Sequence, residues 1–147
     1  MDQFECKKDG YLISTDTTKL DIDMIHAFLG ERSHWAQGRT RQAVLSSIEH
    51  SLCFGLYRSD GEQVGFARVI TDRTTFAWVC DVFILESYRG KGLAKWLIKS
   101  IIENPDIKGL HRILLESRDA QGLYSKYGGF SPLENPKRLM ARIRCDE

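Results

Sequence analysis

The sequence predicts an α+β fold, with a central and mostly antiparallel sheet that has helices on both faces. Two hairpins predict the antiparallel part: Ser59-Asp60-Gly61 and a polar turn at 71–74 separate three apolar runs. The third run, 76–85, is apolar on both faces, as in a central strand that is covered on both sides. A helix, a short strand and another helix follow, which predicts one splayed parallel strand pair joined by a right-handed crossover.

The first fifty residues are expected to supply one strand and two helices. Tyr11–Ser14 has the length and apolar content of a short strand. Leu20–Leu29 carries apolar residues at helical spacing, with Asp21 or Asp23 in position to cap the helix. Thr40 stands in the same position before a second helix, whose apolar side chains would face the sheet.

The second half of the chain alternates between the two kinds of periodicity. A helix over 93–103 is expected to end at Asn104-Pro105, because proline interrupts a helix. A final helix from Asp119 to about 127 is expected to end at Gly128-Gly129. The strands expected from residue 52 onward are 52–57, 63–70, 76–85, 112–115 and 139–143.

Length and composition predict a single domain, residues 1–147, in the cytoplasm. A chain of 147 residues with 42% hydrophobic residues can bury a core without disulfides. Twenty-one Lys and Arg against twenty Asp and Glu give a net charge of +1, whereas proteins that bind nucleic acid usually carry a basic surplus. The sequence has no apolar run of membrane-spanning length and no apolar segment of a signal peptide. We therefore expect no nucleic-acid partner and no membrane.

Cysteine spacing argues against both a disulfide framework and a metal site. The four cysteines are scattered and form no C-x-x-C pair, and no paired histidine spacing accompanies them: Cys6, Cys53, Cys80 and Cys145. We expect reduced thiols and no bound metal.

The segment Tyr88-Arg89-Gly90-Lys91-Gly92-Leu93-Ala94-Lys95 predicts an anion site. Two glycines two residues apart let the backbone turn tightly, so that several N–H groups converge on one point. The following helix adds its unpaired N-terminal N–H groups and the positive end of its dipole. Three basic side chains accompany these amides, which suits a phosphate or a pyrophosphate. Glycine and lysine are also common at the start of a helix that binds no ligand.

Two nucleotide-binding patterns fit this segment poorly. A P-loop would need G-x-x-x-x-G-K-[ST], which is absent. A dinucleotide fingerprint would need a third glycine where Lys95 stands, and it would open a βαβ unit, whereas this loop follows antiparallel strands. Glu116, near the end of the next strand, is the one feature that favours a nucleotide-binding Rossmann protein.

Two motifs together resemble a known family. Arg89-x-x-Gly92-x-Ala94, after an apolar strand, is similar to the Q/R-x-x-G-x-G/A signature of the GNAT superfamily of N-acetyltransferases. The run 120–130, AQGLYSKYGGF, resembles the family's A-x-x-L-Y-x-K-x-G-F helix. The resemblance covers about residues 76–130 and implies a GNAT-like fold. It also implies transfer of an acetyl group from acetyl-CoA to a primary amine of a small molecule or peptide.

The chain departs from the family pattern at two places. Gly128 and Gly129 stand where the family has a single glycine before the aromatic residue. Ser117 stands where the family often has asparagine, so that its contact with the cofactor rests on a shorter hydroxyl.

The resemblance implies specific contacts with acetyl-CoA, used as a co-substrate without a metal. The pyrophosphate would rest on backbone N–H groups of Arg89, Gly90, Lys91, Gly92, Leu93 and Ala94. The pantetheine arm would pair, like a strand, with backbone groups of Val82, Phe83 and Ile84. Tyr124 matches the family position that supplies a proton to the leaving thiolate, and its alternative role is that of a core aromatic residue.

The general base is less clearly marked than the acid. Asp81 is a carboxylate inside an apolar strand, so it needs either a partner, such as Arg68, or a catalytic task, such as deprotonating the amine. Weaker candidates for the base are Glu86, Glu116, His34 and His111. Cys80 as a covalent nucleophile is disfavoured, because a cysteine in a buried strand usually behaves as a small hydrophobic residue.

The loop 32–39 lies where the family builds the wall of the acceptor site. Its Trp35 and neighbouring cations point to an aromatic or anionic feature of the acceptor, although an anchored surface loop would have the same composition. The alternative to an enzyme is a non-catalytic acyl-CoA-binding sensor or interaction module on the same fold. The resemblance also makes a homodimer compatible with the sequence, because the family often dimerises through late strands.

Overall fold

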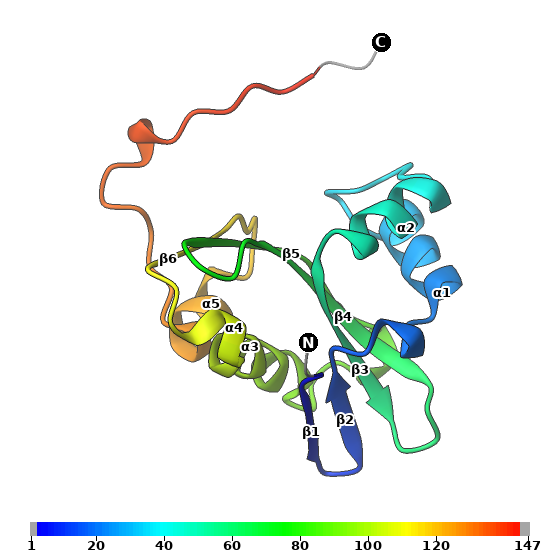
Figure 1. Cartoon of the computed structure of the whole chain (residues 1–147). Coiled ribbons are helices and arrows are strands. Elements are labelled where there is room, and N and C mark those ends of the chain that lie inside the picture. The colour runs from blue at the N-terminus through cyan, green and yellow to red at the C-terminus, as the bar shows by residue number, and fades with distance from the viewer. Residues whose placement is uncertain (1–2, 145–147) are drawn as a thin grey trace.

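Six strands form one sheet in the order β1-β2-β3-β4-β5-β6 (Figure 1). The computed structural model describes residues 3–144. All neighbouring strands are antiparallel except β5 and β6, which are parallel. The predicted fold class is therefore confirmed. The strands are β1 Glu5–Lys8, β2 Tyr11–Ser14, β3 Leu52–Arg58, β4 Gln63–Thr71, β5 Phe76–Ile84 and β6 Arg112–Leu115.

Helices cover both faces of this sheet (Figure 1). One face carries α1 Ile22–Ala27, the π-helical turn η2 Phe28–Arg32 and α2 Arg41–Glu49, and the other carries α3 Leu93–Glu103 with α4 Pro105–Lys108 and α5 Gln121–Gly128. The short 3₁₀ turns are η1 Thr17–Lys19, η3 Glu86–Tyr88 and η4 Pro136–Arg138. Among residues 3–144, no helix has the length and apolar character needed to cross a membrane.

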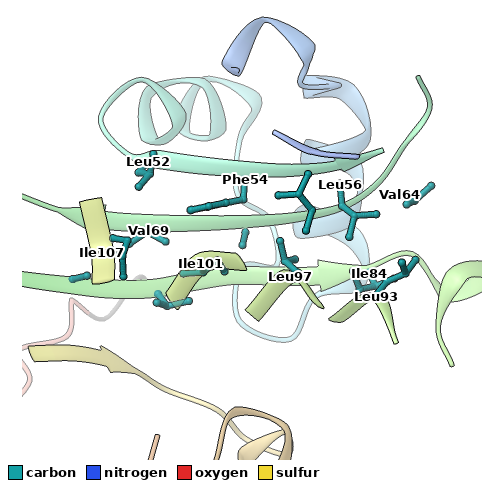
Figure 2. Close-up of a cluster of buried hydrophobic side chains, with 14 residues drawn as sticks. Leu52, Phe54, Leu56, Val64, Val69, Ile84, Leu93, Leu97, Ile101 and Ile107 are labelled. Atoms are coloured by element: carbon teal, nitrogen blue, oxygen red, sulfur yellow. The ribbon is translucent and has the colours of Figure 1, made fainter. Parts of the chain in front are cut away.

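The larger hydrophobic core lies between the sheet and α3 (Figure 2). Leu93, Leu97 and Ile101 recur at helical spacing, so they point from one side of α3 onto the strands. On β3, Phe54 belongs to this core, whereas the neighbouring Cys53 belongs to the core under α1 and α2. Alternate residues of the strand thus point into the hydrophobic cores on opposite faces, as expected for a sheet that is covered on both faces.

Side-chain caps begin the two N-terminal helices as predicted. Asp21 accepts a hydrogen bond from the Met24 N–H at 3.1 Å, and Thr40 accepts one from the Ala43 N–H at 3.1 Å. At α5 the prediction was wrong, because Asp119 does not cap the helix. Ser117 Oγ instead accepts the Ala120 N–H at 2.9 Å, in the turn that precedes α5.

The structure adds one strand that sequence analysis missed, β1. It pairs with β2 through a tight turn in which Asp9 has φ 52° and Gly10 has φ 82°. Positive φ at both central residues is the geometry that favours Asp-Gly, so this dipeptide was the signal that could have revealed the hairpin. Its strand Glu5–Lys8 is polar and mostly exposed, which hid it from an analysis of apolar periodicity.

The last predicted strand, 139–143, is wrong for the described chain. These residues pair with no strand of the same chain, and the segment after α5 projects away from the sheet (Figure 1). Its apolar side chains are left in solvent, where Leu139 is 52%, Met140 90% and Ile143 81% exposed. The described cysteines, Cys6, Cys53 and Cys80, are free thiols, and Cys145 lies outside the described residues.

Candidate active site

The two parallel strands separate half-way along β5, and this opens an edge. β5 pairs with β6 only from Phe76↔Arg112 to Val79↔Leu115, after which the chain leaves β6 for the turn before α5. On its other side, β5 stays paired with β4 as far as Ile84. Within residues 3–144, the stretch 80–84 therefore has no strand neighbour on the β6 side. The predicted parallel pair is confirmed, and its short length produces the opening.

A β-bulge at Asp81 marks the point where the edge opens. Arg68 pairs with Cys80 and Phe66 with Phe83, so two residues of β5, Asp81 and Val82, face one residue of β4. Asp81 has φ 51°, a left-handed conformation that aspartate tolerates better than most residues. The bulge also shifts the alternation of side chains by one residue. Val79 before it and Ile84 after it both face the α3 core, although they are five positions apart.

The carboxylate of Asp81 is held by three donors. It accepts hydrogen bonds from Trp35 Nε1 at 2.8 Å, Arg39 Nη1 at 2.7 Å and Arg68 Nε at 2.8 Å. Burial of this side chain, only 1% exposed, would raise its pKa, but hydrogen bonds and charges of Arg68 and Arg39 outweigh burial and keep the pKa below its ordinary value. Asp81 is thus an ion-paired carboxylate at neutral pH.

Trp35 and Arg39 bring the loop before α2 onto β5. The loop has its own framework, because Ser33 donates from Oγ to the Leu29 carbonyl and accepts the Ala36 N–H. Sequence reasoning anticipated the bond from Asp81 to Arg68 but missed Trp35 and Arg39. The signal was the buried carboxylate itself, which needed more than one donor.

A cleft of about 710 Å³ lies between this loop, the middle of β5 and the turn that leads into α5. We call it the central cleft. Four predicted site residues line it together: Asp81, Val82, Ser117 and Tyr124. Two of the weaker base candidates, His34 and Glu116, also line it, as does Cys80, the disfavoured nucleophile; the other two, Glu86 and His111, are exposed residues away from it. Trp35 and Trp78 give the cleft two aromatic walls.

Tyr124 enters the central cleft from α5 as a protonated phenol. Burial raises its pKa to about 12, so the hydroxyl keeps its proton at neutral pH. The ring packs edge-on against Phe130 at a centroid distance of 6.0 Å. Burial also raises the pKa of the Cys80 thiol, to about 11, which makes this thiol a poor nucleophile at neutral pH.

Each of the two glycines after Tyr124 has its own structural reason. A Cβ at Gly128 would stand 2.8 Å from the Phe130 ring, so this position has no room for a side chain. Gly129 has φ 73° and ends α5 as a left-handed C-cap. The extra glycine thus lets the helix stop while Phe130 folds back under Tyr124.

The glycine-rich loop lies at the other end of the open edge, beyond Ile84. Gly90 and Gly92 have φ 81° and 79°, and a Cβ at either would meet nothing within 4 Å. Among the described residues, the backbone N–H groups of 90–94 donate no hydrogen bond to a protein acceptor. Lys91 is exposed beside them at the N-terminus of α3. Free amides, a helix N-terminus and a cation therefore meet at one place.

Some backbone N–H and C=O groups of β5 point toward the open edge. Leu85 donates its N–H to the Val64 carbonyl on the β4 side, so by alternation the groups of Ile84 and Val82 face the opposite, open side. Arg89 Nε donates a hydrogen bond to the Ile84 carbonyl at 3.0 Å, so the guanidinium is turned back toward β5. Phe83 contributes a buried ring, stacked on Phe28 at 3.9 Å.

The family profile described as the acetyltransferase (GNAT) family matches residues 22–130 of the chain. The chain belongs to the GNAT acetyltransferase family. The GNAT match includes the loop 89–94, the whole of α5 and the loop that carries Trp35. The resemblance drawn from the two motifs is thereby confirmed.

Individual relatives agree with the family. FG08082 of Gibberella zeae, a protein named as an acetyltransferase, is 34% identical over 137 residues that cover 79% of this chain and 76% of the relative. A crystal structure of a GNAT-family protein from Xanthomonas campestris pv. campestris is 43% identical, covers 94% of this chain and 96% of its own, and superposes with a TM-score of 0.88. A Staphylococcus aureus protein of unknown function, 24% identical over 92% and 99% of the two chains, has the same fold at a TM-score of 0.70.

This GNAT chain presents groups that fit an acyl-CoA donor. The unpaired amides of 90–94 and Lys91 match a diphosphate, and the open side of Val82 and Ile84 matches an extended chain of amides. The His, Cys, Asp and Glu side chains of residues 3–144 form no cluster of three that could hold a metal ion. The fit therefore lies in the backbone far more than in particular side chains.

Proposed function

We propose that this protein transfers an acetyl group from acetyl-CoA to a primary amine of a small molecule or peptide, by direct attack of the amine. The observation that carries the proposal is the layout of the open edge of β5. A loop of free amides lies at one end of this edge, and a cleft lined by a protonated phenol lies at the other. Such a layout can hold a long anionic donor and present its reactive end to an acceptor.

The donor half of the site is built from backbone. The N–H groups of residues 90–94, reinforced by Lys91 and the N-terminus of α3, hold the diphosphate. The open groups of Val82 and the N–H of Ile84, whose carbonyl already accepts a hydrogen bond from Arg89 Nε, hold the pantetheine amides as an added strand would be held. Acetyl-CoA supplies the activated thioester carbonyl. Ser117, already bonded to the Ala120 N–H, lines the cleft next to Tyr124.

Tyr124 acts as the general acid in this proposal. Its pKa of about 12 lies above the value of about 8.5 typical of a thiol, so a free tyrosinate is not a stable product of the transfer. The phenol gives its proton to sulfur as the carbon–sulfur bond breaks, and it regains a proton from the nitrogen that has just been acylated. The proton lost by the amine thereby ends on the thiol, and Tyr124 returns to its starting state.

For Asp81 the contacts favour a positioning role over the role of general base. A carboxylate with three donors and a lowered pKa is a weak acceptor for the proton of an amine. The same contacts fix Trp35 and Arg39 as walls of the central cleft. We therefore propose that Asp81 shapes the acceptor side. Solvent that enters the open cleft takes the proton of the ammonium form before attack, and the second proton, lost after attack, is the one that passes through Tyr124 to sulfur.

The enzyme is tested with Tyr124→Phe and the matched control Tyr127→Phe. Both residues lie on α5, but Tyr127 packs among lysines, with Lys95 Nζ 5.2 Å from its ring, and does not line the central cleft. Turnover is measured as release of the CoA thiol together with the mass of the acetylated product, over a panel of amines. Tyr124→Phe is expected to lower kcat by about 10²–10⁴-fold with little change in KM for acetyl-CoA, and Tyr127→Phe to leave both within about twofold. Unchanged turnover of Tyr124→Phe would remove this residue as the acid.

Binding is measured separately, as the shift of the unfolding temperature with added acetyl-CoA. The donor is expected to raise that temperature, because a ligand that binds the native state stabilises it. Stabilisation without turnover on any amine would favour the acyl-CoA-binding sensor, and no stabilisation at millimolar acetyl-CoA would refute the donor itself.

A further inference from the structure

The acceptor side of the central cleft has exposed apolar walls. Within residues 3–138, two large hydrophobic side chains are exposed, Trp35 at 42% and Ile70 at 44%, and both line this cleft. Ile70 pairs across the sheet with Trp78, which lines the cleft as well. The Trp35 ring is held in place, because its Nε1 donates to Asp81. Apolar side chains that are fixed and left uncovered in a cleft mark a surface for the apolar part of a ligand.

The same side of the cleft has one more guanidinium than carboxylate. Arg39 and Arg68 both bond to the carboxylate of Asp81. Arg68 also donates from Nη1 to Ser51, whereas Arg39 donates only from Nη1, to Asp81. Among the described residues, Nε and Nη2 of Arg39 have no protein acceptor, and its side chain is 24% exposed. Arg39 therefore keeps N–H groups free for an anion in the cleft, and a guanidinium matches the geometry of a carboxylate.

The opposite wall of the cleft has the reverse balance of charge. The turn before α5 contributes two exposed carboxylates, Glu116 and Asp119, and one base, Arg118. Tyr124, on the helix that follows this turn, lines the same cleft. An ammonium group is therefore attracted toward the side of Tyr124, and an anionic group toward Arg39. Opposite charges on two walls of one cleft orient a ligand that carries both.

We propose that the acceptor is an amine that also carries a carboxylate and an apolar group, as a free amino acid with an apolar side chain does. This assignment rests on the proposed acetyl transfer. Arg39 binds the carboxylate, Trp35 and Ile70 contact the apolar side chain, and the amine points toward Tyr124. One unmatched guanidinium suits a carboxylate better than a phosphate group, which carries nearly two charges. Arg39 is thus a specificity-determining residue of the acceptor site.

The first test measures binding without chemistry, using N-acetylated ligands of the full-length protein. N-acetyl-L-phenylalanine and N-acetyl-L-phenylalaninamide have no titratable amine and differ only in the carboxylate. Their dissociation constants are obtained from the unfolding temperature over a series of ligand concentrations, with and without CoA. The acid is expected to bind about 10–100-fold more tightly than the amide, because only the acid forms a charged pair with Arg39. N-acetylglycine, which lacks the apolar side chain, is expected to bind about tenfold more weakly than the phenylalanine derivative, or weaker still.

Arg39→Gln and the matched control Arg41→Gln locate the contact. Each variant removes one positive charge, and Arg41 lies at the start of α2, in an exposed pair with Asp23 and outside the cleft. Arg39→Gln is expected to bring the affinities for the acid and the amide within about twofold of each other, and Arg41→Gln to keep the wild-type ratio. A cleft that was merely loosened by the loss of one bond to Asp81 would weaken both ligands alike and keep the ratio.

Turnover separates this inference from the proposed function. The wild type is expected to acetylate L-phenylalanine with a kcat/KM about tenfold or more above the values for L-phenylalaninamide and phenethylamine. Equal transfer to all three amines overturns the amino acid acceptor and leaves the acetyltransferase in place. No transfer to any amine, with the acid still preferred through Arg39, refutes the proposed transfer and supports the carboxylate site.

The binding data can overturn the inference in three ways. Acid and amide that bind the wild type equally, or not at all, remove the carboxylate from the site. A preference for the acid that survives Arg39→Gln removes Arg39 as its partner. N-acetylglycine that binds as tightly as N-acetyl-L-phenylalanine removes the apolar side chain from the acceptor.

Discussion

Replacing Asp81 by asparagine tests the ion pairs that join the loop before α2 to β5. Asparagine keeps the shape and one carbonyl acceptor, but it leaves Arg68 and Arg39 without their shared negative charge. Removing one partner of a buried ion pair costs about 3–5 kcal/mol. The side chain of Asp81 is only 1% exposed, whereas those of Arg68 and Arg39 are 12% and 24% exposed, so some of the lost interaction is recovered from water. We therefore expect the lower end, about 3 kcal/mol, or about 6–12 °C in unfolding temperature for a chain of this length.

The matched control is Asp106→Asn, which breaks the ion pair with Arg73 between two distant parts of the chain. This carboxylate is 43% exposed, so its loss should cost about 1 kcal/mol or less. Urea and thermal unfolding at pH 7 are followed by circular dichroism for both variants. If Asp81→Asn lost no more stability than Asp106→Asn, Asp81 would not be the anchor that its contacts indicate.

The pH dependence gives a second readout for Asp81. Because its folded-state pKa is lowered, its contribution to stability is fully present above the pKa of the unfolded chain, about 3.9, and is lost as the pH falls through the folded-state value. The difference between the wild type and Asp81→Asn should therefore be constant near neutrality and shrink below about pH 4. In the same variant, a positioning role predicts a larger change in KM for the amine than in kcat and an unchanged shape of the pH–rate profile. Loss of one limb of that profile would instead identify Asp81 as the base.

Two further substitutions test the donor loop and the thiol. In Gly92→Ala the added Cβ meets no neighbouring atom, but alanine must adopt a left-handed backbone, at a cost of about 1–2 kcal/mol. We therefore expect this variant to bind acetyl-CoA more weakly when binding is measured by titration calorimetry. The control Gly109→Ala is also in open space but has no positive φ, so it should bind acetyl-CoA normally. Cys80→Ser should keep turnover within a few-fold, because a thiol with a pKa of about 11 does not carry the acetyl group at neutral pH. A dead Cys80→Ser enzyme, together with an acetylated Cys80 detected in the wild type by mass spectrometry, would contradict direct attack.

The elements foreseen from sequence are those whose signals are local. The helix Leu93–Glu103 and the strand Arg112–Leu115 have the predicted bounds, because a clear apolar stripe and a proline stop define the first and flanking polar turns define the second. The caps at Asp21 and Thr40 are equally local, since each depends on a contact three residues away. Strand β1 was missed because a polar edge strand buries too little to leave an apolar pattern.

The site was harder to foresee because its geometry depends on distant pairings. The bulge at Asp81 is invisible in a strand that is apolar on both faces, since a shift of one residue changes no visible alternation. Trp35 and Arg39 reach Asp81 across 46 and 42 positions of sequence, a distance that no motif encodes. The glycine loop and Tyr124 were found because each belongs to a compact motif. That the glycine-rich loop and Tyr124 lie along the same open edge of β5 follows from the pairing of the strands, which neither motif encodes.

The two sides of the site come from separate parts of the sequence, and this affects how the choice of acceptor can change. The backbone loop and α5 come from residues after 88, whereas Trp35 and Arg39 come from a loop that precedes the third strand. In the proposed enzyme, new side chains in that early loop would alter the choice of amine without changing the backbone groups that hold acetyl-CoA. The same scaffold can thus accept different acceptors through changes in the loop before α2, provided that the ion pairs of Asp81 at the β-bulge are kept.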